Sequence, residues 1–293
     1  MTGLIDAHTA HAEREDLVFV EVAPWRVMAE GPDPITGSIP GAVRTSVRAD
    51  FAGIPTDTSG HLPLPARDAV HAGMRAHGVL PDDDIVVHTR RIEELSSAAR
   101  AWFVLTWAGF TSVRVLDGGL PAWVRAGGPT GAPREPGPSA TAVDAPIPPP
   151  AGQSGGRRVL DARDVLDIAR YGTLLDSRPA ASYNGTEGEP RTGHVPHAVH
   201  ALSSELVAPD GLLRPLPDLR RWFLSRRAIG AHEVGAYCGG GVSSALLVFV
   251  GALLDQQVGL YVDSWSAWGR DASLPVEQGA HLTRSGAVDV DCA

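Results

Sequence analysis

Short apolar segments, separated by longer stretches of mixed polarity, recur along the whole chain. Six of them share this pattern: Leu17–Val22, Asp84–His88, Ser112–Leu116, Thr173–Leu175, Glu233–Tyr237 and Gly259–Val262. Apolar and polar positions do not alternate within them, so each predicts a short strand that is buried on both faces of a mostly parallel sheet. Amphipathic or apolar helical segments lie between the strands. This order predicts an α/β fold with helices on both faces of the sheet.

One of the intervening helices can be bounded from its end signals. Asp161 is a candidate N-cap, with Asp164 three residues further on. Val165 and Ile168 have the spacing of an inner helical face, and Gly172 marks the end. An acidic N-cap and a terminal glycine are typical of helix boundaries.

The two halves of the chain repeat the same order of features. Ser96-Ser97-Ala98 and Ser243-Ser244-Ala245 each open an apolar helix after a strand and a loop. Between the halves lies a segment rich in Pro, Gly and Ala, which is typical of a linker. The repeat predicts two tandem α/β domains. We predict an N-terminal domain over residues 1–126, a linker over 127–158 and a C-terminal domain over 159–293.

Composition and charge narrow the classes of function. The formal net charge of -9 argues against a nucleic-acid-binding protein, which needs a basic face. The most apolar stretch, Ala245–Leu254, has about half the length of a membrane span, and no basic and apolar leader opens the chain. We therefore expect a cytoplasmic protein without nucleic-acid or membrane partners. Its two cysteines, Cys238 and Cys292, do not make a disulfide framework, and Cys292 is interpreted as an incidental surface thiol.

The loop after the second-half strand Glu233–Tyr237 carries the candidate chemistry. It begins with Cys238 and continues through Gly239, Gly240, Gly241, Val242 and Ser243 into a helix. The three glycines permit a tight curl, in which backbone N–H groups turn toward the sulfur. The helix adds the positive end of its dipole. Both effects favour the thiolate, which is the nucleophile, and would also stabilise a persulfide. The alternative is a buried cysteine that acts only as a small hydrophobic residue.

This loop resembles the six-residue active-site loop of the rhodanese family, in its mercaptopyruvate sulfurtransferase form more than in its thiosulfate form. Leu175-Asp176-Ser177-Arg178 and Gly193-His194-Val195-Pro196 are similar to two further motifs of that family. Asp263-Ser264-Trp265-Ser266-Ala267-Trp268 resembles its closing element, and Asp117–Trp123 repeats that element in the first half. The resemblance extends from about Leu17 to Pro275 and implies two tandem rhodanese-like domains.

The resemblance also implies roles for residues outside the loop. In tandem rhodaneses the first domain usually lacks the cysteine, and here His88–Glu94 occupies the corresponding loop. Mercaptopyruvate enzymes hold the substrate carboxylate with two arginines; one aligns with Arg191, and the other position is Ser182. Their Asp–His–Ser relay aligns with Asp50 and His61, while Gly240 stands where the serine would be. We expect Arg191 and Ser182 to contact the donor, and Asp50 and His61 as accessory residues.

The sequence disfavours two other kinds of enzyme, a zinc enzyme and a rhodanese-fold phosphatase. His194, His197 and His200 lie in a loop that contains Pro196, so they share no helix face and do not predict a zinc site. We expect neither a metal nor an organic cofactor. A rhodanese-fold phosphatase would need an arginine at the end of the loop, where this chain has Ser244.

The resemblance implies a sulfurtransferase of the thiosulfate or mercaptopyruvate type. Cys238 would take sulfur from the donor as a persulfide and pass it to cyanide, a thiol or a protein acceptor, which is covalent catalysis. The alternative is a non-enzymatic sulfur carrier or partner-binding module in which the departures at Ser182 and Gly240 have removed activity.

Overall fold

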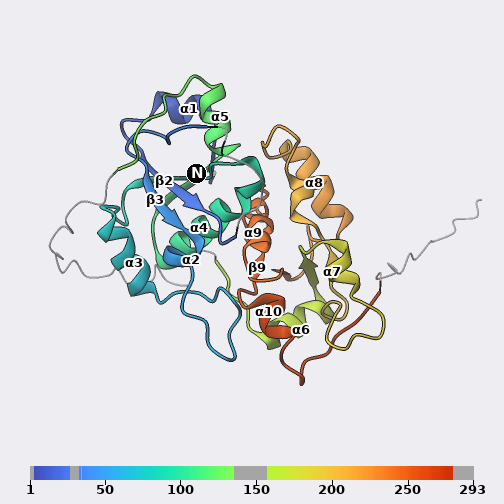
Figure 1. Ribbon diagram of the computed structural model, residues 1–293. Helices are drawn as coiled ribbons and strands as arrows, with labels where there is room; N and C mark the ends of the chain where they lie inside the picture. The colour runs from blue at the N-terminus through green and yellow to red at the C-terminus, as the bar shows by residue number, and fades with distance from the viewer. Residues whose placement is uncertain (1–2, 27–32, 34, 135–156, 280–293) are drawn as a thin grey trace, which may run out of the picture.

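The computed structural model describes residues 3–26, 33, 35–134 and 157–279. It contains two all-parallel sheets with helices packed on them, one in each half of the chain (Figure 1). The predicted α/β fold with two domains is therefore confirmed. Within the described residues, no helix combines the length and the apolar character that crossing a membrane requires.

The first domain has a five-stranded sheet in the order β1-β5-β4-β2-β3. Its strands are β1 (Leu4–Ile5), β2 (Val18–Ala23), β3 (Val43–Ser46), β4 (Asp84–His88) and β5 (Ser112–Leu116). Its helices are α1 (Ala7–Ala12), α2 (Val47–Asp50), α3 (Arg67–Ala76), the 3-10 helix η1 (Ile92–Glu94), α4 (Leu95–Ala108) and α5 (Gly119–Arg125).

The second domain has a four-stranded sheet in the order β7-β6-β8-β9. Its strands are β6 (Thr173–Asp176), β7 (Val199–His200), β8 (Val234–Tyr237) and β9 (Gly259–Leu260). Its helices are α6 (Ala162–Tyr171), α7 (Ala180–Asn184), the 3-10 helix η2 (Ser203–Leu206), α8 (Leu216–Ser225), α9 (Ser243–Leu253) and α10 (Ser264–Trp268).

The strand registers show that the two domains repeat each other residue by residue. In the first sheet Glu21 of β2 lies opposite His88 of β4, and in the second Asp176 of β6 lies opposite Tyr237 of β8. Thr89, the residue after β4, therefore occupies the position of Cys238. The predicted duplication is confirmed, and the first domain has threonine where the second has the thiol.

Helix α6 begins and ends where its end signals predict. The Asp161 side chain accepts hydrogen bonds from the backbone N–H groups of Arg163 and Asp164, and Asp164 caps the Asp161 N–H in return. This reciprocal arrangement is a capping box, which satisfies donors that the first turn would leave unpaired. Val165 and Ile168 are buried, and Gly172 follows the last turn.

The predicted linker is too long at its first end. Residues 127–134 pack on the first domain, where Gly131 pairs with Ser38 and the Arg134 N–H donates to the Ala42 carbonyl. Proline and glycine content predicted a free connection, but these backbone groups find partners along the segment before β3. Residues 135–156 of the predicted linker lie outside the described residues, as does Cys292.

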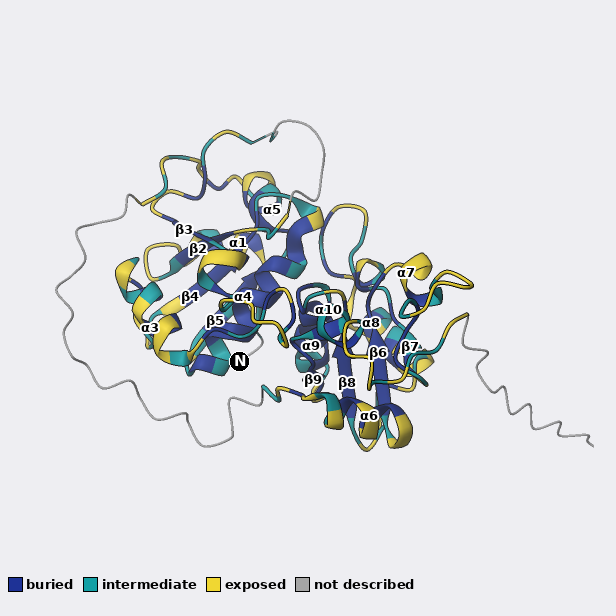
Figure 2. Ribbon diagram, turned by 60° about the horizontal axis from the view of Figure 1, so that its bottom comes forward, coloured by how far each residue is buried: buried dark blue, intermediate teal, exposed yellow. Residues whose placement is uncertain are grey.

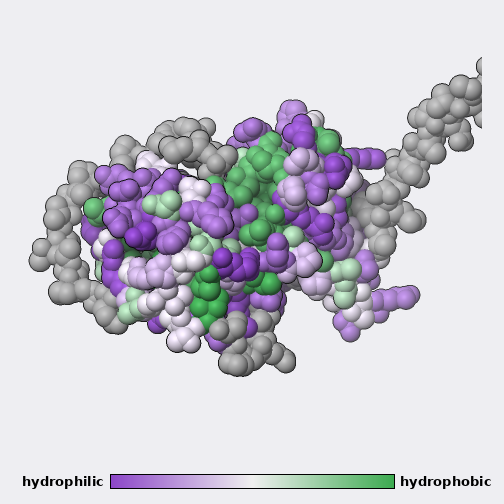
Figure 3. Space-filling model, turned by 90° about the horizontal axis from the view of Figure 1, so that it is seen from above, coloured by the Kyte–Doolittle hydropathy of each residue, from purple (hydrophilic) through white to green (hydrophobic). Residues whose placement is uncertain are grey.

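One hydrophobic cluster spans both domains, and each domain has a further cluster of its own. Helices α4 and α9 pack against each other, with Trp102 edge-on to Phe249 at 4.8 Å between ring centroids. Both helices are buried along most of their length (Figure 2). Hydrophobic residues also gather along the junction of the two lobes on the face shown in Figure 3. This continuous apolar contact fixes the first domain against the loop that follows β8.

His88, at the end of β4, is a buried histidine that makes the fold sensitive to acid. It is 0% exposed, and neither ring nitrogen has a hydrogen-bond partner among the described residues. Burial lowers the pKa of His88 from 6.5 to about 4. The unfolded chain therefore binds a proton at this histidine more readily than the folded chain does. The free energy of unfolding is unaffected by His88 above pH 6.5 and falls by about 1.4 kcal/mol per pH unit as the pH drops toward 4. His88→Leu should remove this acid-dependent loss, as measured by urea unfolding at pH 7 and pH 4.5.

The exposed His8 of α1 offers a matched control. His8→Leu removes a histidine without removing a buried one, so it should keep the wild-type pH dependence. If His88→Leu and the wild type lose equal stability on acidification, His88 is not the group responsible.

Candidate active site

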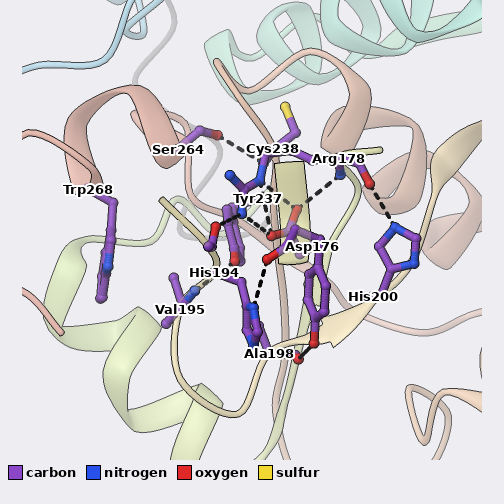
Figure 4. Close-up of polar contacts among 12 residues, drawn as sticks. Asp176, Arg178, His194, Val195, Ala198, His200, Tyr237, Cys238, Ser264 and Trp268 are labelled. Atoms are coloured by element: carbon purple, nitrogen blue, oxygen red, sulfur yellow. Dashed lines mark hydrogen bonds and ion pairs between the residues drawn. The ribbon is translucent and has the colours of Figure 1, made fainter. Parts of the chain in front are cut away.

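Cys238 lies directly after β8, at the carboxyl end of the second sheet, where ligands bind in open α/β folds. Its backbone N–H donates to Ser264 Oγ at 3.2 Å, and its carbonyl accepts from the Trp265 N–H at 2.9 Å. The start of α10 therefore holds the backbone on both sides of the cysteine. Sγ points away from the polar network around Asp176 and His194 (Figure 4).

The glycine loop curls around the sulfur and leaves it open on one side. The Gly241 N–H donates to Cys238 Sγ at 3.1 Å. Gly241 has φ +77°, and a Cβ there would lie 2.6 Å from the Val262 carbonyl oxygen, so only glycine fits. A Cβ at Gly239 would meet nothing within 4 Å, so the loop is open beside this residue, which lines the same cavity as Cys238. The sequence predicted several backbone N–H groups around the sulfur. Among the described residues, one hydrogen bond of this kind is present, from Gly241.

Cys238 lines a cavity of about 440 Å³ between the two domains. Although it is 3% exposed, the thiol can be reached from this space. The first domain contributes Trp25, Arg26, His61, Leu62, Glu93, Glu94, Ser96 and Ser97 to the lining. The second contributes Arg178, Pro179, Ser182, Cys238, Gly239, Gly240, Val242, Ser243, Trp265 and Ser266. The predicted position of Cys238 at an interdomain cleft is confirmed.

Hydrogen bonds from backbone N–H groups of the first domain to side chains at α10 attach this wall of the cavity to the second domain. The Gly60 N–H donates to Asp263 Oδ1 at 2.8 Å, and the His61 N–H donates to Ser266 Oγ at 2.9 Å. A Cβ at Gly60 would lie 2.3 Å from the Asp263 carbonyl oxygen, so the two chains pack without space for a side chain. These contacts hold His61 beside Gly240 at the mouth of the cavity.

Arg178 lines the cavity, but its guanidinium is occupied by the fold. Nη2 donates to Asp176 Oδ2 and to the Gly193 carbonyl, both at 2.6 Å, and Nε reaches the same carboxylate. The guanidinium also lies 4.2 Å from the centre of the Trp265 ring. The predicted internal pairing of Arg178 is confirmed: its charge is neutralised by Asp176, and its guanidinium packs on the Trp265 ring.

His194 is a structural residue, as its position in the motif predicts. The ring is 0% exposed and stacks on Tyr183 at 3.9 Å between centroids. Its Nδ1 lies 2.8 Å from the Tyr183 carbonyl. This packing orients α7, which carries Ser182 into the lining of the cavity.

The structure does not bring Arg191 to Cys238, which corrects the prediction that it contacts the donor. Its guanidinium donates to the carbonyls of Trp268, Gly269, Asp271 and Leu274. These carbonyls belong to the last residue of α10 and to the turn after it, and Arg191 is absent from the cavity lining. Four backbone acceptors satisfy its donors, so the arginine closes this turn. Alignment with a motif located the residue but not the direction of its side chain.

Asp50 and His61 are likewise not brought together. Asp50 Oδ2 accepts from the Ser46 N–H at 2.8 Å, and Oδ1 lies 3.3 Å from His77 Nε2. Asp50 thus caps α2 and pairs with the residue after α3, and it does not line the cavity. His61 does line the cavity, so one of the two accessory residues lies at the site. The predicted Asp–His relay has no contact to support it.

Three residues of the first-domain wall were not found from the sequence. Trp25 and Arg26 follow β2 and line the cavity, and the Arg26 guanidinium lies over the Trp25 ring at 4.9 Å. Glu94 ends η1 and is 7% exposed; burial raises the pKa of its carboxyl above the ordinary value. The sequence contained a signal for Glu94. Ser96-Ser97 and Ser243-Ser244 lie at the starts of the equivalent helices α4 and α9, and both helix starts line the same cavity, so the residue just before Ser96-Ser97 could be expected near it.

Among the residues that the structure describes, the second domain brings one thiol to the cavity, and the first domain supplies a supporting wall. Thr89, at the position equivalent to Cys238, is 1% exposed and does not line the cavity. Its carbonyl accepts from the Leu120 N–H at 2.9 Å, as the Cys238 carbonyl does from Trp265. The first copy keeps the backbone of the loop without its chemistry.

Comparisons with known proteins agree with this geometry. Residues 8–126 match the family model described as a rhodanese-like domain. Over 264 residues the chain is 34% identical to a protein of Mycobacterium tuberculosis named putative thiosulfate sulfurtransferase SseB, with 87% of this chain and 89% of the relative covered. The chain belongs to the rhodanese family.

This rhodanese is also similar to a 3-mercaptopyruvate sulfurtransferase of Escherichia coli, with 32% identity over 94% of the chain and 91% of the relative. The crystal structure of SseA from Escherichia coli matches 91% of this chain and 100% of that one, with a TM-score of 0.70 and 27% identity. An anaerobic ergothioneine biosynthesis enzyme from Chlorobium limicola matches 95% of this chain and 71% of that one, with a TM-score of 0.78 at 18% identity. The last likeness shows the fold alone.

Proposed function

We propose that this rhodanese is a sulfurtransferase that carries sulfur as a persulfide on Cys238. The observation that supports this most directly is the placement of Sγ, 3.1 Å from the Gly241 N–H and open to a cavity of about 440 Å³. A backbone donor beside a sulfur that can be reached from outside favours a nucleophilic thiolate and then a terminal persulfide anion.

The first half of the reaction loads the cysteine. The Cys238 thiolate attacks the outer, sulfane sulfur of thiosulfate or the sulfur of mercaptopyruvate. A new S–S bond forms, and the bond between the transferred sulfur and the donor breaks. Its electron pair leaves with sulfite or with the enolate of pyruvate, which then takes a proton. The Gly241 N–H remains directed at the sulfur whose charge is being redistributed.

The second half returns the enzyme to its starting state. A thiophilic acceptor (cyanide, a small thiol or a protein thiol) attacks the terminal sulfur of the persulfide. The S–S bond breaks, and its electron pair returns to Cys238 as the thiolate. Two displacements at one residue are the signature of a ping-pong mechanism. The room in front of Gly239 gives the acceptor access.

The cavity lining supports an anionic donor. Arg26 supplies a positive charge from the first domain, whereas Arg178 lines the same space but is paired with Asp176. Glu93 and Glu94 add two carboxyl groups, and burial of Glu94 raises the pKa of its carboxyl and so favours its neutral form. The Ser182 hydroxyl and His61 add polar groups at the same space. We propose that Ser182 and His61 contact the donor, in place of the clamp that Arg191 was predicted to form. The free thiol on which the cycle depends fits a reducing compartment, and we place the reaction in the cytoplasm.

Mass spectrometry of the intact protein tests the proposal. After incubation with thiosulfate or mercaptopyruvate and removal of the donor, the chain should gain the mass of one sulfur atom. A reducing agent should remove it, and digestion should place it on Cys238. Addition of cyanide should discharge the sulfur as thiocyanate. If neither donor adds sulfur to Cys238, the proposal fails; loading without discharge to any acceptor would instead favour the non-enzymatic carrier.

A further inference from the structure

Arg100 is a fully buried arginine from the domain that lacks the cysteine. It lies in α4 and is 0% exposed. Nε and Nη2 donate to the Phe51 carbonyl at 3.2 and 3.1 Å, and Nη2 also reaches the carbonyls of Leu62 and Pro63 at 3.0 and 3.3 Å. The guanidinium therefore ties together the segment that carries His61.

No carboxylate pairs with this cation among the described residues: its hydrogen-bond partners are backbone carbonyls. Burial lowers the pKa of Arg100 to about 10, and the charges of Cys238 and Asp263 act in the opposite direction. The side chain thus stays charged at neutral pH. Burying an unpaired charge costs several kcal/mol of folding free energy. Such a charge is retained where a function needs it, or where carbonyls and a nearby anion offset that cost.

Gly241 connects this cation to the thiol. Nη1 of Arg100 donates to the Gly241 carbonyl at 3.4 Å, while the Gly241 N–H donates to Cys238 Sγ at 3.1 Å. A Cβ at Gly241 would lie 3.1 Å from Arg100 Nη1. Gly241, whose φ of +77° favours glycine, is thus held between the sulfur and the buried guanidinium.

We propose that Arg100 is a positioning residue for sulfur transfer: from the first domain it holds Gly241 against Cys238 and supplies the positive charge that favours the thiolate and the persulfide anion. The inference rests on the proposed function of Cys238. It also gives the first domain a part in the chemistry, because the charge that acts on the thiol comes from α4.

Other charged groups face the thiol from the elements packed around it, and a test must hold them constant. Arg26, His61, Glu93 and Glu94 face the cavity from the first domain, and Arg178 faces it from the second. Asp263 lies at the start of α10. None of them is changed when Arg100 alone is substituted, so the difference between Arg100 variants isolates its charge.

The experiment measures the rate at which iodoacetamide alkylates Cys238 as a function of pH, in a Cys292→Ser background. Arg100→Gln keeps amide donors for the Phe51 and Leu62 carbonyls but removes the charge. We expect the pH midpoint of alkylation to rise by about one pH unit, and the rate at pH 7 to fall about tenfold. Arg100→Lys keeps the charge, so its midpoint should stay within about 0.3 pH units of the wild type.

Arg157→Met is the matched control. Arg157 stacks on Trp102 at 3.8 Å and donates to Thr106, both on α4, without touching the thiol loop. This variant should lower the melting temperature and leave the midpoint unchanged. An unchanged midpoint in Arg100→Gln, or equal midpoints in Arg100→Gln and Arg100→Lys that both differ from the wild type, would overturn the proposal. Alkylation needs no sulfur donor, so this result is independent of whether the protein transfers sulfur.

A second variant serves if Arg100→Gln does not fold. Arg100→Met places an apolar side chain of similar length in the buried site and removes the charge, so the alkylation rate at pH 7 should fall about tenfold, as in Arg100→Gln. An Arg100→Met rate equal to that of the wild type contradicts the proposal.

Discussion

Cys238→Ser is expected to lower kcat/KM for sulfur transfer by roughly 10⁴-fold or more, because the substitution removes the atom that carries the sulfur. The serine hydroxyl fits the same space but is a poor nucleophile toward sulfur at neutral pH. The loss should be the same with thiosulfate and with mercaptopyruvate, since both donors load one residue. Steady-state release of sulfite, pyruvate and thiocyanate measures it.

Cys292→Ser is the matched control for this substitution, because it removes the other thiol of the chain. It should retain nearly full activity with both donors. The persulfide mechanism is wrong if Cys238→Ser retains activity comparable to the wild type, or if the two variants lose activity equally.

Asp176→Ala is expected to destabilise the fold by about 3–5 kcal/mol, because it leaves the buried Arg178 guanidinium without its carboxylate. The side chains of Asp176 and Arg178 are 0% and 7% exposed, and Nη2 lies 2.6 Å from Oδ2. The pair joins β6 to the loop before β7, so its loss acts on the sheet that carries Cys238. The free energy of unfolding in urea measures the effect.

The pair between Asp218 and Arg221 on α8 provides the comparison. Its Nη2–Oδ1 distance is also 2.6 Å, but the arginine and aspartate side chains are 74% and 40% exposed. Asp218→Ala should cost about 1 kcal/mol or less, because solvent screens an exposed pair. Equal losses in Asp176→Ala and Asp218→Ala would mean that burial does not govern the strength of the Asp176 pair.

The parts of the fold that depend on local signals were predicted from the sequence. The bounds of α6 follow from a capping box that Asp161 and Asp164 form between themselves. The central strands of both sheets follow from short apolar runs, and Cys238 follows from its place between a strand and a helix. Such signals depend on only a few neighbouring residues, so they can be read from the sequence without knowing which segments pack against them.

Side-chain direction depends on distant segments and was not predicted. Arg191 has φ +65° and turns toward carbonyls almost 80 residues away in sequence, where a motif alignment suggested a donor clamp. Asp50 pairs with His77 because α2 and α3 pack together. Arg100 looks like one polar residue in an apolar helix, and only the packing of α4 on α9 places it beside Gly241. The edge strands β1, β3 and β7 were missed, whereas the two-residue edge strand β9 lies within the apolar segment Gly259–Val262, which was predicted as a strand.

The packing of α4 on α9 bears on how a duplicated chain divides its labour. When two copies share an apolar cluster, removal of either copy would expose the apolar face of the other, so the copy without the thiol is needed for the stability of the copy that carries it. The first copy is then free to change at the positions that face its sister: Thr89 replaces the nucleophile, while the Gly60–Asp263 and His61–Ser266 hydrogen bonds attach one copy to the other. The domain without the thiol thus serves as one wall of the cavity that Cys238 lines.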